Sequence, residues 1–170
     1  VVLAQAKEAL AGKLIISIAA GVSMGNIQSV AGMDARVVRV MPNTPALVQA
    51  GATALAPGRF ATAEDMAQAQ ALFGAVGVTA VVRPDQMDAI TGLTGSGPAY
   101  VFRMIEALLE AARQQGLDEA DAARLVKQMV YGASLLALKS EFPPEELRRR
   151  VTSPKGTTEA GLRTLEEKGF

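Results

Sequence analysis

The stretch LIISIAAG at residues 14–21 decides the fold class of this chain. Its first five residues form a short, β-branched run, which is typical of a strand buried on both faces of a parallel sheet. Small residues follow at the carboxyl end of that strand: Ala19, Ala20 and Gly21. Ligands of open α/β sheets bind at this edge, where small side chains let the backbone approach closely. The stretch therefore predicts a strand whose end binds a ligand.

Strand and helix patterns alternate around this stretch. The sequence predicts strands at residues 36–40, 50–56 and 76–82 and helices at residues 1–10, 24–30 and 63–73. Such an alternation indicates half of a doubly wound α/β domain.

The phosphate-binding turn of such a domain has no counterpart in the sequence. A Rossmann-like, dinucleotide-binding domain carries a G-x-G-x-x-G turn after its first strand, and no such turn follows a strand here. The closest spacing, Gly92, Gly95 and Gly97, is followed by Pro98 and a long helical pattern. We therefore expect residues 1–84 to be the C-terminal half of a Rossmann-like domain, in a chain that starts partway through that domain.

The strand predicted at residues 36–40 runs into the sequence MPNTP at residues 41–45. Its two prolines predict a stiff loop without regular structure. Asn43 between them offers a donor and an acceptor, which suits a ligand that carries an amide. Alternatively, Asn43 binds to its own backbone.

From residue 85 onward the sequence predicts only helices, at residues 98–115, 118–139 and 145–150. The polar residues of the first helix form one narrow stripe, and residues 129–138 of the second carry no charge. Helices this apolar must be covered on almost every side, and one chain offers too few other elements to do so. We expect residues 85–170 to form an all-α dimerisation domain with an interlocked interface, and a monomer with a tight helical core is the alternative.

The sequence VTSPKGTTEAGL at residues 151–162 predicts a loop that opens a helix. Ser153, Thr157 and Thr158 can cap this helix, and Glu159 adds an acid to its first turn. The free N–H groups at such a helix start bind carboxylates or phosphates. The alternative is an ordinary capped turn.

Composition excludes several classes of chemistry. The 170 residues contain no cysteine and no histidine, which excludes disulfides, thiolate catalysis and the commonest general base and metal ligand, and we expect no metal site. Lys and Arg balance Asp and Glu at 17 each, so charge indicates neither a nucleic-acid nor a membrane partner. No signal-peptide pattern is visible, and the longest uncharged run of the second half, residues 128–138, is too short to span a bilayer. We expect a cytoplasmic protein.

Four stretches together resemble the pyrroline-5-carboxylate reductase family, in order and in spacing. They are ISIAAG at residues 16–21, MPNTP at 41–45, TGSGPAY at 94–100 and TSPKGTT at 152–158. The resemblance implies hydride transfer from NADPH or NADH to the C=N bond of 1-pyrroline-5-carboxylate, which gives L-proline in the last step of proline biosynthesis. A chain without His and Cys fits this reaction, because the cofactor carries the hydride. The resemblance also implies a truncated chain, since family members begin with the phosphate-binding half and usually extend by one helix beyond Phe170.

The resemblance further implies which residues bind substrate. Thr158 would place its hydroxyl on the ring nitrogen, as the catalytic contact. The backbone amides of Gly156, Thr157 and Thr158, next to Ser153, would hold the substrate carboxylate. Glu141 would face the positive imine, and its alternative is a solvated carboxylate at a helix end.

Cofactor and assembly follow from the same resemblance. Ile18, Ala19 and Ala20 would contact the cofactor, with Asn43 beside its nicotinamide end. Lys155 stands where many relatives have glycine, and we expect its side chain to point to solvent. Family members form intertwined homodimers, often assembled into rings such as a decamer, in which a site can take its loop from the neighbouring chain.

Two other functions are consistent with parts of the sequence. A β-hydroxyacid dehydrogenase resembles G-x-x-G-x-G-x-x-x-K, and Gly92, Gly95 and Gly97 fit that pattern, but Val101 stands at the lysine position. The other is a non-catalytic dimerising or cofactor-sensing protein that keeps the fold without the chemistry.

Overall fold

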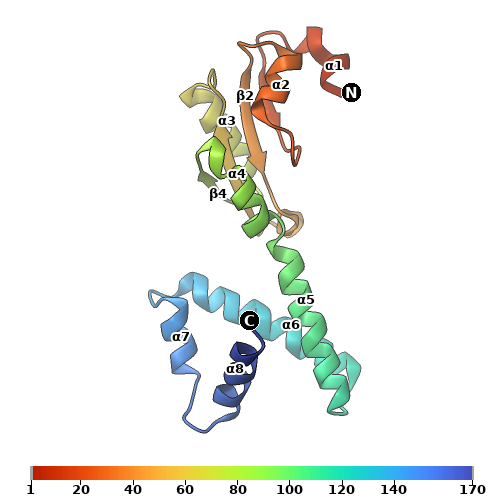
Figure 1. Cartoon of the computed structure of the whole chain (residues 1–170), viewed down its shortest axis with the longest axis vertical. Coiled ribbons are helices and arrows are strands. Elements are labelled where there is room, and N and C mark those ends of the chain that lie inside the picture. The colour runs from red at the N-terminus through yellow and green to blue at the C-terminus, as the bar shows by residue number, and fades with distance from the viewer. Residues whose placement is uncertain (1, 170) are drawn as a thin grey trace. The chain divides into compact units, whose positions relative to one another are not determined.

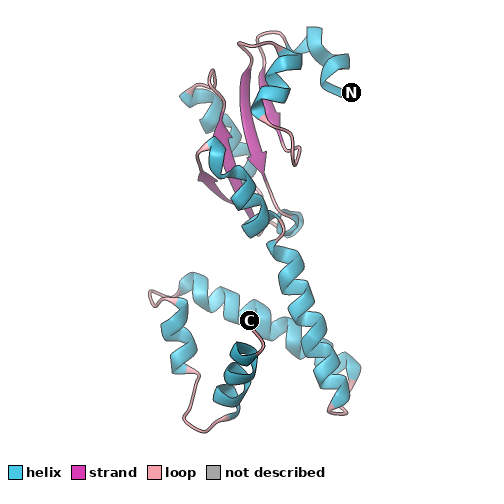
Figure 2. Cartoon of the chain, viewed as in Figure 1, coloured by secondary structure: helices cyan, strands magenta, loops and turns pink. Residues whose placement is uncertain are grey.

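The computed structural model describes residues 2–169. The chain divides into two compact units, Val1–Arg103 and Met104–Phe170. All strands of the described residues lie in the first unit, and the second is helical (Figure 2). The domain boundary between residues 84 and 85 stays a prediction.

The first unit alternates short helices with four strands. In chain order its elements are α1 (Val2–Ala6), η1 (Lys7–Leu10), β1 (Leu14–Ser17), α2 (Met24–Ala31), β2 (Arg36–Met41), η2 (Thr44–Val48), β3 (Gly51–Pro57), α3 (Ala63–Gly74), β4 (Gly77–Val81), η3 (Pro84–Gln86), α4 (Met87–Ile90) and η4 (Thr91–Gly95). The first three η segments are 3-10 helices and η4 is a π-helix.

Four longer elements complete the chain: α5 (Gly97–Gln114), α6 (Glu119–Lys139), α7 (Pro144–Arg150) and α8 (Thr157–Glu167). The predicted order, an α/β part followed by helices only, is confirmed. Two local predictions are wrong. Residues 1–10 are not one helix, because η1 replaces the second half. The MPNTP loop is not free of regular structure, because Pro45 lies in the first turn of η2, where a missing N–H costs no hydrogen bond.

The sheet has the strand order β1-β2-β3-β4 (Figure 1). The pairs β1–β2 and β3–β4 are parallel, and β2–β3 is antiparallel. The antiparallel pair follows from its short connection, residues 42–50, because a parallel pair needs a longer crossover. The result is a mixed sheet built around a doubly wound pattern.

Helices cover both faces of this sheet (Figure 1). On one face Val38, Val40 and Leu55 pack with Ala69 of α3. On the other face, two clusters pack against α2 and α4: Ile15, Ile27 and Val37, and Met41, Ala54, Ala56 and Met87. The two central strands, β2 and β3, are therefore the core of the unit.

Strand β1 departs from its prediction. It lies at the edge of the sheet and ends at Ser17, and among its residues only Ile15 is buried. Ile18 beyond it is 60% exposed. β1 nevertheless packs on both faces of the sheet, since Ile15 joins the cluster beside α2 and the partly buried Leu14 and Ile16 pack against the cluster beside α3. The predicted burial on both faces is therefore only partial in β1.

A close backbone contact fixes the start of β3 and β4. Gly51 pairs with Gly77, whose φ is 152°. A Cβ added at Gly77 would lie 2.0 Å from the carbonyl oxygen of Gly51. Only glycine fits there, so this pair sets the register of the two strands.

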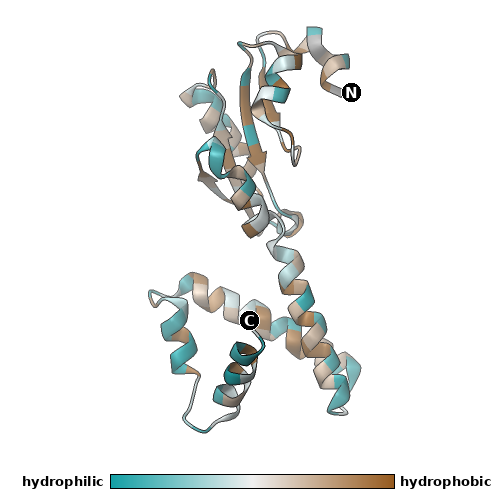
Figure 3. Ribbon diagram, viewed as in Figure 1, coloured by the Kyte–Doolittle hydropathy of each residue, from teal (hydrophilic) through white to brown (hydrophobic). Residues whose placement is uncertain are grey.

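The helical unit buries little of its apolar surface. Within its described residues the buried hydrophobic side chains are Ala112 and Ala122. Large apolar side chains on α6 stay exposed: Leu125, Met129, Tyr131, Leu136 and Leu138. Hydrophobic residues recur along the ribbon of the helical unit, as its brown segments show (Figure 3). A tight helical core, the alternative expectation for a monomer, is therefore absent from the described part of this unit.

Candidate functional site

The carboxyl end of β1 presents accessible backbone. The N–H of Ala19 donates to Ser17 Oγ at 3.4 Å, and residues 18–20 are exposed. Gly21, with φ 72°, turns the chain away from the strand. A hollow of about 590 Å³ lies over this strand end, and Ile18 and Ala19 line it together with residues of α1 and α2. Three of the four residues predicted to bind the cofactor, Ile18, Ala19 and Ala20, are thus open to a ligand.

Asn43, the fourth, connects two distant backbone segments. Its Oδ1 accepts the N–H of Ala52 at 2.9 Å, and its Nδ2 donates to the carbonyl of Thr94 at 3.1 Å. The alternative of a bond to its own local backbone is therefore wrong. One N–H and one lone pair of the side-chain amide remain for a ligand. Asn43 also lines a hollow of about 510 Å³ with Thr94 and Tyr100.

The bond to Thr94 has a cause in the sequence TGSGPAY. In a helix the Thr94 carbonyl would accept the N–H of residue 98, but Pro98 has none. Asn43 supplies the missing donor. Sequence reasoning missed this role, although a proline four residues after Thr94 is the signal for it.

The π-helix η4 frees a second carbonyl in the same motif. The N–H of Ser96 donates to Thr91 at 2.8 Å, five residues back, so Gly92 loses its usual α-helical donor. The Tyr100 hydroxyl donates to the Gly92 carbonyl at 3.1 Å. Side chains therefore satisfy two carbonyls that the irregular turn exposes, which holds the start of α5 in one shape.

The loop before α8 leaves backbone donors available. Gly156 is the N-cap of α8, and no side chain caps it. The predicted caps Ser153, Thr157 and Thr158 therefore do not cap α8 with their hydroxyls, and the choice between an anion site and an ordinary turn stays a prediction. The Gly156 N–H donates to the Ser153 carbonyl at 3.0 Å. The N–H groups of Thr157 and Thr158 lie in the first turn, where a helix has no internal acceptor for them.

Lys155 has an unusual backbone conformation in this loop. Its φ is 60°, in the left-handed region that glycine adopts without steric cost. Its N–H donates to Glu159 Oε2 at 2.7 Å, and the residue is exposed. Lys155 is thus exposed, as expected, in a backbone conformation that glycine would adopt without steric cost.

Glu141 lies apart from these backbone bonds. It follows Ser140, the C-cap of α6, in an exposed turn where the Phe142 N–H donates to Ser140 Oγ at 3.0 Å. Within the described residues, no hydrogen bond or ion pair joins Glu141 to the loop. Its role in substrate binding stays a prediction.

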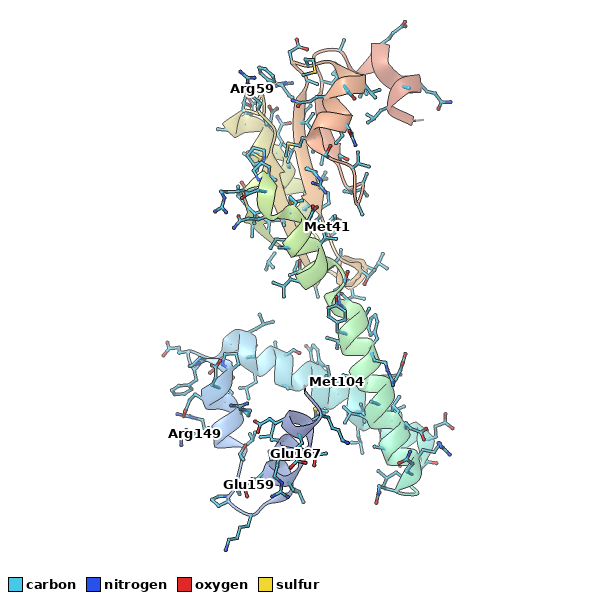
Figure 4. The ribbon with its side chains drawn as sticks, viewed as in Figure 1. Met41, Arg59, Met104, Arg149, Glu159 and Glu167 are labelled. Atoms are coloured by element: carbon cyan, nitrogen blue, oxygen red, sulfur yellow. The ribbon has the colours of Figure 1, made fainter. Side chains whose placement is uncertain are left out.

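A charged hollow of about 500 Å³ lies between α7 and α8, and Thr152 and Glu159 of the loop region line it. On α7, hydrogen bonds from Arg149 and Arg150 lower the pKa of Glu146 to about 2. The Arg150 guanidinium also lies 3.7 Å from the centre of the Phe142 ring. These local contacts fix α7, the element that precedes the loop (Figure 4). Sequence reasoning did not find them.

The described residues also bear on the predictions of metal binding and membrane insertion. Residues 2–169 contain no cluster of acidic side chains that could hold a metal ion. Among the same residues, no helix is both long enough and apolar enough to cross a membrane.

Comparison with protein families decides the relationship of the chain. Residues 84–170 match the model of the pyrroline-5-carboxylate reductase dimerisation domain. The chain belongs to the pyrroline-5-carboxylate reductase family. The Methanosarcina acetivorans pyrroline-5-carboxylate reductase is 47% identical over 158 residues, which are 93% of this chain and 58% of that protein. This chain thus spans somewhat more than half the length of the curated reductases that it matches.

Solved pyrroline-5-carboxylate reductases share the fold. The Plasmodium falciparum reductase, solved with NADP bound, is 34% identical with a TM-score of 0.93, over 99% of this chain and 68% of that one. The Coxiella burnetii reductase is 42% identical with a TM-score of 0.91, over 98% of this chain and 63% of that one. The predicted fold class, a Rossmann-like α/β part followed by a helical dimerisation domain, is confirmed.

Proposed function

We propose that this protein reduces 1-pyrroline-5-carboxylate to L-proline with a hydride from NADPH or NADH. The observation that carries the proposal is the start of α8, where Thr157 and Thr158 offer free N–H groups next to two hydroxyls. Membership in the pyrroline-5-carboxylate reductase family supports it. The substrate carries one carboxylate and one ring nitrogen, which this donor set suits.

The chain's own residues bind and orient the substrate. The N–H groups of Thr157 and Thr158 donate to the carboxylate, which the helix N-terminus also attracts. The Thr158 hydroxyl forms a hydrogen bond with the ring nitrogen. Ser153 and Gly156 complete the loop, but the Gly156 N–H must give up its bond to the Ser153 carbonyl to join them. Glu141 places a negative charge where positive charge develops on the imine.

The cofactor residues of the proposal are Ile18, Ala19, Ala20 and Asn43. The exposed backbone at residues 18–20 and the remaining donor of Asn43 fit a carboxamide-bearing nicotinamide ring. A P. falciparum relative was solved with NADP bound, which supports a nicotinamide cofactor here. NADPH or NADH, when bound, supplies the hydride for the imine carbon.

The proposal includes an assembly and a location. The exposed apolar side chains of α6 and the dimerisation family model support a homodimer, and a higher ring such as a decamer belongs to the proposal. Residues 1–84 form the cofactor-binding domain and residues 85–170 the dimerisation and substrate-binding domain. The protein acts in the cytoplasm, without a nucleic-acid or membrane partner.

Loss of the nicotinamide absorbance on addition of 1-pyrroline-5-carboxylate tests the proposal, with the full-length natural protein. Turnover that yields proline supports it, and no turnover with either NADPH or NADH contradicts it. We expect Thr158→Ala to lower kcat/KM by about two- to tenfold, because a lost neutral hydrogen bond costs about 0.5–1.5 kcal/mol. Thr158→Ser keeps the hydroxyl and should retain most activity.

Thr164→Ala is the matched control. Its hydroxyl donates to the Ala160 carbonyl within α8, one turn or more beyond the loop. We expect unchanged kinetics for it. Equal effects of Thr158→Ala and Thr164→Ala would remove the role assigned to Thr158.

A further inference from the structure

Two backbone N–H groups of the loop that precedes α8 form hydrogen bonds within the loop and the first turn of the helix. The Gly156 N–H donates to the Ser153 carbonyl at 3.0 Å, and the Lys155 N–H donates to the Glu159 carboxylate at 2.7 Å. The two donors are those of Lys155 and of the residue after it, and the φ of Lys155 is 60°, in the left-handed region. An L-residue other than glycine adopts this conformation only when its surroundings favour it.

Glu159 is the third residue of α8 and reaches back across the helix start (Figure 4). In a capping box the third helical side chain accepts the N–H of the N-cap residue. Here the N-cap is Gly156, and its N–H is already bound to Ser153. The carboxylate therefore takes the next donor, the Lys155 N–H, and so ties the left-handed residue to the helix.

We propose that Glu159 is a positioning residue for the substrate loop, holding Lys155 in its left-handed conformation. This inference rests on the proposed function. With the donors of residues 155 and 156 used inside the loop, the N–H groups of the first helical turn, at Thr157, Thr158 and Glu159, are the ones left for a carboxylate. Because a glycine at position 155 needs no such restraint, the role of Glu159 depends on the lysine in this chain.

The surroundings of Glu159 are compatible with an anionic substrate beside it. Three arginines, Arg148, Arg149 and Arg163, line the same hollow as Glu159 between α7 and α8. Glu145 and Glu166 line it too, so three carboxylates face three guanidinium groups, and Arg149 is also bonded to Glu146. The charges of the hollow balance, so Glu159 does not make it a negatively charged surface that would repel the substrate.

A four-variant cycle in the full-length natural protein tests this role, with KM for 1-pyrroline-5-carboxylate as the main measurement. Glu159→Ala should raise this KM by about tenfold, because the bond to a charged acceptor is lost. The KM for NADPH should not change. Glu159→Gln keeps an acceptor oxygen and should stay within about threefold of the natural protein.

The decisive measurement is whether glycine at position 155 restores the KM that Glu159→Ala raises. Lys155→Gly should leave KM near its natural value, and Lys155→Gly combined with Glu159→Ala should restore most of what Glu159→Ala loses, because glycine is left-handed without help. Glu167→Ala, at the far end of α8, is the matched control for removal of a carboxylate. Additive effects without rescue, or a Glu159→Gln defect as large as that of Glu159→Ala, would overturn the inference.

Amide hydrogen exchange separates this inference from the proposed function. If the natural protein does not turn over 1-pyrroline-5-carboxylate, the proposed function fails and the loop is still measurable. The Lys155 N–H should exchange faster in Glu159→Ala than in the natural protein and in Glu159→Gln. Equal exchange in all three proteins would show that Glu159 does not hold the loop.

Discussion

The contacts inside the α/β unit differ in kind from the contacts inside the helical unit. In the α/β unit, side chains such as Leu55 and Met87 are fully buried, and ion pairs join elements far apart in the sequence, such as Arg36 with Asp65. In the helical unit, the buried hydrophobic side chains among the described residues are Ala112 and Ala122.

The ion pairs described in the helical unit join residues that are close in the sequence. They join residues three or four apart on one helix: Glu110–Arg113, Asp121–Arg124, Glu146–Arg149 and Glu146–Arg150. Such pairs stabilise single helices without bringing helices together. The α/β unit therefore buries its apolar side chains against its own elements. The apolar faces of α5 and α6, by contrast, need a further surface to cover them.

The largest expected effect is in the α/β unit, at Gly77. A Cβ there would lie 2.0 Å from the Gly51 carbonyl oxygen, so Gly77→Ala must separate the starts of β3 and β4. We expect it to lower the free energy of unfolding by about 3 kcal/mol or more, measured by urea denaturation. Gly74→Ala is the control, because a Cβ at Gly74 meets nothing within 4 Å. Similar stability of the two variants would show that the strand starts can shift freely.

The second prediction compares one leucine from each unit. Leu55 is fully buried, and Leu138 is 84% exposed. Leu55→Ala should lower the free energy of unfolding by about 3 kcal/mol. Leu138→Ala should change it by less than about 0.5 kcal/mol in the dissociated chain.

Concentration separates these two leucines further. If a second copy covers α6, Leu138→Ala should weaken self-association in sedimentation equilibrium, and Leu55→Ala should not do so at temperatures where it stays folded. An effect of Leu138→Ala on unfolding as large as that of Leu55→Ala, independent of concentration, would break the comparison between the units.

Sequence reasoning recovers what local patterns encode. The strands predicted at residues 36–40, 50–56 and 76–82 agree with β2, β3 and β4 to within one residue at each end. The valine-rich runs at residues 36–40 and 76–82 and the flanking turn residues are local signals. The exposed apolar side chains of α6 were likewise visible as an uncharged run.

Contacts between distant residues were not recoverable in this way. The bonds of Asn43 to Ala52 and Thr94 depend on the tertiary fold, so the sequence showed a polar side chain without its partners. The left-handed Lys155 was also hidden, because lysine rarely adopts that conformation. The four-stretch resemblance supplied the family, while the physical reasons for its motifs came from the structure.

The third prediction concerns Asn43, whose side chain bonds to two backbone segments of the α/β unit that are distant from it in the sequence. Asn43→Ala leaves the Ala52 N–H and the Thr94 carbonyl without their partner. We expect a loss of about 2 kcal/mol in the free energy of unfolding, because both groups are partly buried. Asn43→Asp should be at least as damaging, since it replaces the donor to Thr94 with an oxygen.

Asn26→Ala provides the control for Asn43. Asn26 lies in α2 and is exposed, and its bonds to Ser23 and Ser29 come from its backbone, which alanine keeps. Its stability should match that of the natural protein within about 0.5 kcal/mol. If Asn43→Ala is as mild as Asn26→Ala, the bridge from η2 to η4 does not stabilise the α/β unit.

The smallest expected effect is in the helical unit and depends on pH. Hydrogen bonds from Arg149 and Arg150 lower the pKa of Glu146 from 4.5 to about 2. A carboxyl whose pKa is lower in the folded state stabilises that state above its unfolded pKa, and this contribution disappears as pH falls through the folded value. Thermal unfolding followed by circular dichroism should therefore show Glu146→Gln less stable than the natural protein at neutral pH, with the difference closing between pH 4.5 and about pH 2. Glu145→Gln, on the same helix, keeps both arginine bonds of Glu146 and should keep the acid dependence that they cause. A difference that persists unchanged down to pH 2 would mean that packing of the Glu146 side chain, and not its local charge pairs, stabilises α7, which would make the helical unit more like the α/β unit than its burial indicates.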